Sequence, residues 1–161
     1  MKYAFPLLLS LAAFPALAND QACQATDEKQ VAALFDRWNE DVQSGDPQRV
    51  VENYAQNSML LPTVSNTPRE TPEANRDYFE HFLALKPKGE IVSRMIMIDC
   101  NTALDTGLYS FRLGDGNTVP ARYTFTYKWV DEAGEWLITS HHSSAMPQKA
   151  EAAQQASNSA H

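Results

Sequence analysis

Two arginines on stretches of alternating sequence are the residues best suited to bind an anion. Arg112 belongs to the stretch 107–113 and Arg122 to the stretch 119–130, and both stretches alternate as β-strands do. A guanidinium group binds a carboxylate through paired hydrogen bonds, so two of them on adjacent strands could hold a small carboxylate. Alternatively, both are ordinary surface residues of a sheet, where charged side chains are common.

A histidine pair and two aspartates offer acid–base chemistry. His141 and His142 are consecutive, so on a strand they point to opposite faces, which argues against a two-histidine metal site. In regular alternation His142 shares the face of Ile138. Either His142 or a buried Asp99 or Asp105 could act as a general base. The simpler interpretation is a histidine hydrogen-bonded within the sheet and aspartates at strand ends.

The sequence lacks the motifs that carry the most specific chemistry. It has no glycine-rich phosphate loop, no dinucleotide fingerprint, no CxxC or HExxH metal motif and no GxSxG elbow. We therefore predict no cofactor and no metal. The formal net charge of −7 argues against a nucleic-acid partner, because an acidic chain repels phosphate backbones.

The elements that must position these residues are helices first and strands second. Helices are predicted to start at the caps Asp27, Asp46 and Thr71, and Gly45 ends the first of them. After Gly89 the apolar period changes from 3.6 to 2. Strands are then expected at 91–101, 107–113, 119–130 and 136–143, after a short one at 59–61. This order predicts an α+β fold, with helices packed on one face of a curved antiparallel sheet.

One face of the stretch 119–130 is aromatic. It carries Tyr123, Phe125, Tyr127 and Trp129. Either these rings pack under the helices while the arginines meet solvent, or the sheet is covered on both sides. In the second case the arginines line a pocket and the rings meet another subunit.

The chain begins like an exported protein. Lys2, the apolar run 4–14 and the small-residue triplet 16–18 have the order of a secretory signal with its cleavage site. The run is too short to cross a bilayer, which needs about 20 residues; an uncut anchor is the alternative. We expect residues 1–18 to be a signal peptide. The mature protein is then expected to be periplasmic or secreted and to lack a membrane span, and its tail at 148–161 is expected to be disordered.

Cys23 and Cys100 are the chain's two cysteines. In an oxidising compartment they can pair, closing a long loop and stabilising the fold by about 4 kcal/mol. The alternative is two buried free thiols.

Several stretches, taken together, resemble the NTF2-like superfamily and, within it, bacterial relatives of the association (hub) domain of calcium/calmodulin-dependent protein kinase II. The resemblance covers about residues 25–147. Its stretches are 38–47 with Tyr54-Ala55, 60–63, 77–79, Cys100-Asn101, 107–111, 121–125, and Trp136 with His141-His142-Ser143-Ser144.

The resemblance implies a cone, in which a long N-terminal helix lies in a strongly curved sheet above a cavity, within one domain at 19–147. It also implies homo-oligomers, dimers at least, and an arginine-lined cavity that accepts small carboxylates. Arg112 and Arg122 fall at matching positions. The aromatic face of 119–130 would then be the oligomer face. The chain has no kinase domain and no calmodulin-target segment, so neither activity carries over.

Three functions follow from these features. The leading hypothesis is a non-catalytic domain that binds a small anionic ligand between Arg112 and Arg122. The predicted walls and neighbours of this site are Trp38, Tyr54, Tyr78 and His142. The second is a small proton-transfer enzyme of isomerase or dehydratase type, with His142 or Asp99 as base. The third is a protein-binding envelope adaptor. The sequence favours a non-catalytic role but leaves an enzymatic one open.

Overall fold

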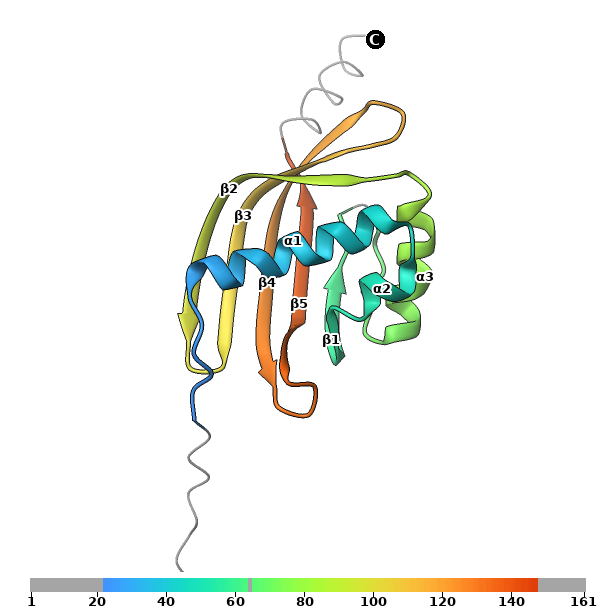
Figure 1. Cartoon of the computed structure of the whole chain (residues 1–161). Helices are drawn as coiled ribbons and strands as arrows, with labels where there is room; N and C mark the ends of the chain where they lie inside the picture. Colours follow the sequence, from blue (N-terminus) through green and yellow to red (C-terminus); the bar gives the residue numbers. More distant parts are fainter. Residues whose placement is uncertain (1–21, 64, 148–161) are drawn as a thin grey trace, which may run out of the picture.

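The computed structural model describes residues 22–63 and 65–147, so the predicted signal peptide and tail lie outside the described residues. This part forms helices and one five-stranded sheet of order β1-β5-β4-β3-β2 (Figure 1). The elements in chain order are α1 (Glu28–Ser44), α2 (Pro47–Val51), β1 (Tyr54–Leu61), α3 (Pro72–Leu83), β2 (Lys88–Asp99), β3 (Thr102–Arg112), β4 (Thr118–Val130) and β5 (Glu135–Ala145). The α+β prediction is confirmed. The sheet is mixed, however, because β1 runs parallel to β5 while the other pairs are antiparallel.

The helices begin where the capping residues predict. The carboxylate of Asp27 accepts a hydrogen bond from the Gln30 amide in a full capping box, and the hydroxyl of Thr71 caps α3 by accepting from the Ala74 amide. Gly45 ends α1 with φ 75°, a left-handed conformation that glycine adopts without strain. Local sequence therefore sets these boundaries.

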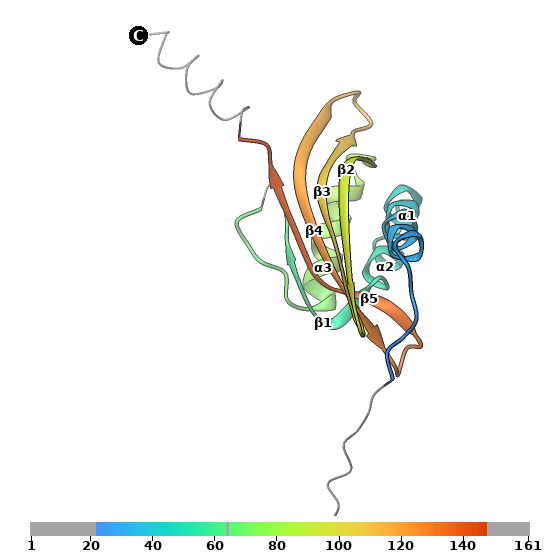
Figure 2. The same cartoon turned by 90° about the vertical axis from the view of Figure 1, so that its left-hand side faces the viewer.

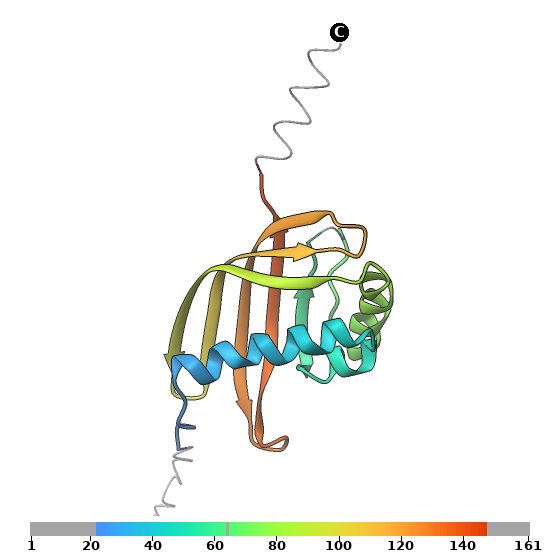
Figure 3. The ribbon, with the colours of Figure 1, turned by 45° about the horizontal axis from the view of Figure 1, so that its top comes forward.

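The helix α1 crosses the concave face of the sheet (Figures 1 and 3). Viewed from the side in Figure 2, α1 and α2 lie on one side of the curved strands. The ring of Phe35 lies 6.1 Å from that of Phe125, and the Trp38 ring lies 5.5 Å from it. The core is thus aromatic and lies between α1 and the sheet.

The aromatic face of β4 belongs to this core. Tyr123, Phe125 and Tyr127 are at most 2% exposed, and Trp129 is half-buried against Trp136. The prediction that these rings form an oligomer face was therefore wrong. They occupy the inward positions of β4, where burial under α1 removes their apolar surface from water.

An extra residue in β5 changes which histidine faces the core. Tyr127 pairs with Ile138 and Thr126 with Ser140, so Thr139 is a bulge residue between them. One added residue reverses the alternation of the strand beyond it. His141 is consequently buried, while His142 is exposed, and the prediction that His142 shares the face of Ile138 was wrong.

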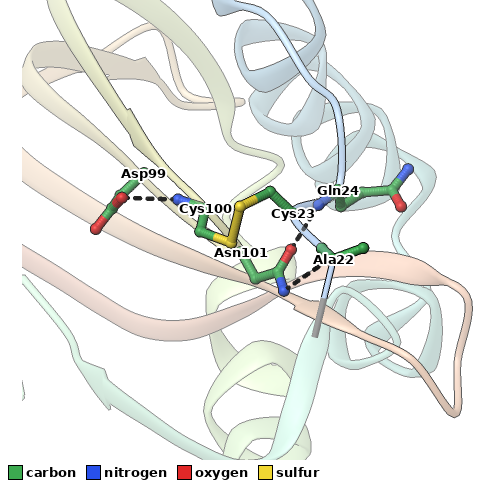
Figure 4. The surroundings of a disulfide bond; sticks show 6 residues. All are labelled: Ala22, Cys23, Gln24, Asp99, Cys100 and Asn101. Atoms are coloured by element: carbon green, nitrogen blue, oxygen red, sulfur yellow. Dashed lines mark hydrogen bonds between the residues drawn. A yellow bond between two sulfur atoms is a disulfide. The ribbon is translucent and has the colours of Figure 1, made fainter. Parts of the chain in front are cut away.

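The predicted disulfide Cys23–Cys100 is present and ties the start of the described chain to the β2–β3 turn (Figure 4). Asn101 reinforces this junction: its side chain accepts a hydrogen bond from the Gln24 amide at 2.7 Å and donates one to the carbonyl of Ala22 at 3.4 Å. None of the helices in the described residues is long and apolar enough to cross a membrane.

Candidate functional site

The two predicted ligand-binding arginines lie outside the cone. Arg112 and Arg122 are exposed, and the Nε of Arg122 donates to the hydroxyl of Ser144 at 3.1 Å. Arg122 and His142 line a shallow hollow on the outer face of the sheet. The arginine-lined cone pocket was thus a wrong prediction, because Arg122 alternates with Ala121 and Tyr123, which point inward.

The two aspartates considered as bases, Asp99 and Asp105, lie in different surroundings. Asp99 is exposed, and its Oδ1 accepts a hydrogen bond from the Cys100 amide at 2.8 Å. Asp105 is fully buried, with Arg94 Nε and the Tyr123 hydroxyl donating to its Oδ1 at 3.1 and 2.8 Å. Burial raises the pKa of Asp105, and its bonds to Tyr123 and Arg94 oppose the rise. Asp105 is therefore held in an internal ion pair. Asp99 lines neither the outer hollow nor the cavity between α1, α3 and the sheet.

A small cavity lies between α1, α3 and the inner face of the sheet. It offers about 10 Å³ to the centre of a water-sized molecule, roughly one such site. Its walls include the predicted Trp38 and Tyr78, and its other polar lining residues are Thr63, Tyr109, His141 and Ser143. The remaining aromatic walls are Phe79, Phe82 and Phe111.

Three hydroxyl groups meet on one side of this cavity. The hydroxyl of Tyr109 donates to that of Ser143 at 2.6 Å, and the Ser143 hydroxyl also shares a hydrogen bond with Thr63. Burial raises the pKa of Tyr109, and the bond to Ser143 offsets part of the rise. These groups therefore stay uncharged at neutral pH and can donate to or accept from a ligand.

His141 ends a second buried chain of hydrogen bonds, which runs from Trp38 through Tyr54. Its Nδ1 is 2.8 Å from the hydroxyl of Tyr54, which accepts a bond from Trp38 Nε1 at 3.1 Å. Its Nε2 is buried and has no hydrogen-bond partner among the described residues. Burial, with a smaller effect of His142, lowers the pKa of His141 to about 3. The imidazole is thus neutral at physiological pH. Tyr54, which was predicted as a wall of the site, does not line the cavity but contacts His141.

A cation lies near the cavity without entering its lining. The guanidinium of Arg69 is 6.0 Å from the ring centre of Tyr78 and pairs with Asp77 at 2.9 Å. Burial raises the pKa of Tyr78 to about 12, although Arg69 lowers it. Within residues 22–63 and 65–147, no group of three or more His, Cys, Asp or Glu side chains is placed to hold a metal ion.

Sequence reasoning did not select Thr63, Tyr109 or Ser143 for the site, and of the histidine pair it chose His142 instead of His141. The alternation of His141 with Ser143 is visible in the sequence, but the face that they occupy depends on the bulge at Thr139.

Comparison with known proteins identifies the family. The model of the calcium/calmodulin dependent protein kinase II association domain matches residues 27–147. The chain is 45% identical to a protein from Xanthomonas campestris whose crystal structure is named after that domain. The similarity covers 84% of this chain and 94% of that one, with a TM-score of 0.72. A search among curated proteins found no match.

More distant structures share the fold. An NTF2-like protein of unknown function from Pseudomonas putida KT2440 is 19% identical over 74% of this chain and 86% of that one, with a TM-score of 0.65. The iota-carbonic anhydrase from a cyanobacterium, complexed with bicarbonate, is 21% identical over 76% and 93% of the two chains, with a TM-score of 0.67. The chain therefore has the NTF2-like fold and belongs to the calcium/calmodulin dependent protein kinase II association domain family.

Proposed function

We propose that the protein binds carbon dioxide and bicarbonate in the small cavity and catalyses their interconversion. The observation that carries the proposal is that His141, whose buried Nε2 has no partner among the described residues, lines this cavity together with the hydroxyl-bearing residues Thr63, Tyr109 and Ser143. A free polar atom inside the fold is costly unless a ligand or water satisfies it. Bicarbonate is a small anion with three oxygens that accept hydrogen bonds, and this lining can supply donors to it.

The cavity's walls also fit this substrate. The space itself admits roughly one water-sized molecule, so the walls must move apart to hold the four heavy atoms of bicarbonate. The rings of Trp38, Phe79 and Phe111 give the apolar surroundings in which carbon dioxide is soluble. The cyanobacterial iota-carbonic anhydrase, whose structure contains bicarbonate, has the same fold. Its name suggests carbon dioxide hydration as the specific activity to test.

The proposed reaction uses neutral groups. The oxygen of a water held by the Ser143 and Thr63 hydroxyls forms a bond to the carbon of carbon dioxide. One carbon–oxygen π bond breaks, and its electrons become the negative charge on the oxygen that faces His141. The water gives up one proton, which passes through the hydroxyl groups to the solvent, so that bicarbonate and a proton are the products. Preorganised donors at the developing charge are the main source of rate in such steps.

We also propose that the protein acts after export and as a homo-oligomer. The order of residues 1–18 and the Cys23–Cys100 bond support export, and membership of a family named after association supports self-assembly. Cell fractionation with the N-terminal mass of the mature protein tests export, and light scattering of the purified protein tests the oligomer.

Stopped-flow hydration of carbon dioxide with a pH indicator tests the catalytic proposal. Purified wild-type protein should accelerate hydration above the buffer rate, and bicarbonate should raise its melting temperature by binding the folded state. Thr63→Val removes a cavity hydroxyl at nearly constant volume and should lower both effects. Failure of the wild-type protein to accelerate hydration, with no thermal shift in bicarbonate, would refute the proposal.

A further inference from the structure

The direction of the hydrogen bonds behind His141 follows from the groups involved. Trp38 Nε1 carries a hydrogen and can only donate, so the oxygen of Tyr54 must accept from it. The hydroxyl of Tyr54 has one hydrogen of its own, and His141 Nδ1 is 2.8 Å away. Donation from Tyr54 to Nδ1 satisfies Trp38 Nε1, the Tyr54 hydroxyl and Nδ1, and leaves only Nε2 of His141 without a partner among the described residues.

The opposite direction leaves more groups unsatisfied. If Nδ1 carried the hydrogen, the Tyr54 oxygen would accept from both Trp38 and His141, and its own hydrogen would have no acceptor among the contacts that the structure gives it. Tyr54 is 7% exposed and His141 4%, so solvent does not readily supply the missing partner. Each arrangement leaves one buried donor without a partner in the protein, Nε2–H in the first and the Tyr54 hydroxyl in the second, and the second also leaves the acceptor Nε2 unsatisfied. The second arrangement therefore has one more unsatisfied buried group, which is unfavourable.

We infer that Tyr54 and Trp38 fix His141 as a neutral imidazole with its hydrogen on Nε2, which donates to the ligand in the cavity. The ligand role rests on the proposed function, whereas the position of the hydrogen does not. The low pKa of His141 agrees with a neutral ring, and the Phe125 ring stacked 4.0 Å from it adds no charge.

The ligand class follows from this arrangement. A ring nitrogen that carries a hydrogen cannot remove a proton from water, so His141 is a donor to the ligand and not the general base. The atom that faces Nε2 must be an acceptor, such as a carboxylate-like or carbonyl oxygen, which excludes ammonium groups from that position.

Nitrogen NMR of the wild-type imidazoles tests the inference directly, because long-range proton–nitrogen correlations show which ring nitrogen carries the hydrogen. We expect hydrogen on Nε2 and a bare Nδ1 for His141 at pH 6 to 8. Hydrogen on Nδ1, or a charged ring in that range, would overturn the inference. This result is independent of whether the protein hydrates carbon dioxide.

A pair of tyrosine substitutions tests the positioning role. Tyr54→Phe removes the donor to Nδ1, so both tautomers should become visible and bicarbonate affinity should fall about tenfold. Tyr127→Phe is the matched control, since it removes a buried hydroxyl that has no partner among the described residues. The control should keep the wild-type tautomer and affinity. A single Nε2–H tautomer in a folded Tyr54→Phe protein would contradict the positioning role.

Substitution of His141 itself separates donation from base catalysis. The side-chain amide of His141→Gln donates a hydrogen bond but is no base, and His141→Leu does neither. Bicarbonate affinity and hydration should persist at a reduced level in His141→Gln and disappear in His141→Leu. Equal loss in both folded variants would argue against the donor role. A wild-type protein with the expected tautomer but without hydration activity would refute only the proposed function.

Discussion

The hydroxyl of Tyr109 on β3 donates to the hydroxyl of Ser143 on β5 at 2.6 Å, across the intervening strand β4. Tyr109 pairs with the small, fully buried Ala121 of β4, whereas Ser143 pairs with Tyr123, so the bond joins positions that are two residues apart along β4. Two strands that are not neighbours thereby present their hydroxyls to one cavity.

Removal of the Ser143 hydroxyl is the first prediction. Ser143→Ala deprives Tyr109 of its acceptor, so the free energy of unfolding should fall by about 1–3 kcal/mol. The hydration rate should fall about tenfold, because one hydrogen bond to the reacting water is lost. Chemical denaturation and stopped-flow kinetics measure the two effects.

Ser144→Ala is the matched control for that experiment. Ser144 is the next residue but lies on the outer face, where it accepts from Arg122. A surface change of this kind should stay within about 0.5 kcal/mol and leave hydration intact. Equal effects of the two substitutions would show that the inner face is not the site.

The second prediction concerns acid stability. The pKa of His141 is about 3 in the folded protein, below its ordinary value of about 6.5. Between these values the unfolded chain binds the extra proton, so this group's stability contribution is full above pH 6.5 and is lost as the pH falls. The loss should approach about 1.4 kcal/mol per pH unit.

The His141→Gln variant isolates this effect, because it lacks the titrating ring while His142 and all other groups remain. Urea unfolding from pH 7 to pH 4 should show a steeper loss of stability in wild type than in the variant. Parallel curves for the two proteins would mean that His141 titrates alike in both states.

The third prediction addresses the internal ion pair. Arg94→Met leaves the buried carboxylate of Asp105 without its cation, which should cost about 3–5 kcal/mol. Adding Asp105→Asn should recover part of this loss, since the buried charge is gone and Tyr123 keeps an acceptor. Denaturant unfolding of the single and double variants measures the difference.

Arg112→Met serves as the control for Arg94, because Arg112 is an exposed arginine of the same sheet. Its effect should stay within about 0.5 kcal/mol. A double variant no more stable than Arg94→Met alone would contradict the explanation by an unpaired charge.

The disulfide gives the fourth prediction. Replacing Cys23 and Cys100 together by serine opens a loop with a sequence separation of 77 and should lower the free energy of unfolding by about 4 kcal/mol. Neither cysteine lines the cavity, so hydration by the folded variant should be unchanged. Reduction of the wild-type protein should reproduce the loss of stability, and an unchanged midpoint after reduction would count against it.

Much of the fold could be predicted because its determinants are local. Asp27 and Thr71 start helices through their own side chains, and Gly45 ends one through its own backbone. The parallel pairing of β1 with β5 joins residues such as Leu60 and His141, which are far apart in the chain. No local pattern encodes that partner, so the mixed sheet was missed.

The site was harder to predict because two bulges change the side of the sheet that a residue faces. Val92 is the extra residue in β2, between the pairs Ile91–Tyr109 and Ser93–Leu108, and beyond it Arg94 turns inward. Thr139 has the same effect in β5 on His141. In a single sequence, the side of the sheet that a strand residue faces is indicated by regular alternation, and each bulge shifts that alternation by one residue.

The four residues His141-His142-Ser143-Ser144 have a property that depends on the Thr139 bulge. If β5 moved by one position along β4, so that the bulge disappeared, His142 and Ser144 would turn toward the interior in place of His141 and Ser143. The inner surface would again carry an imidazole followed by a hydroxyl, and Ser140 would add a further hydroxyl before them. Because each residue type occurs twice in succession, the strand presents an imidazole with a neighbouring hydroxyl in either alignment, at a different depth along the cone.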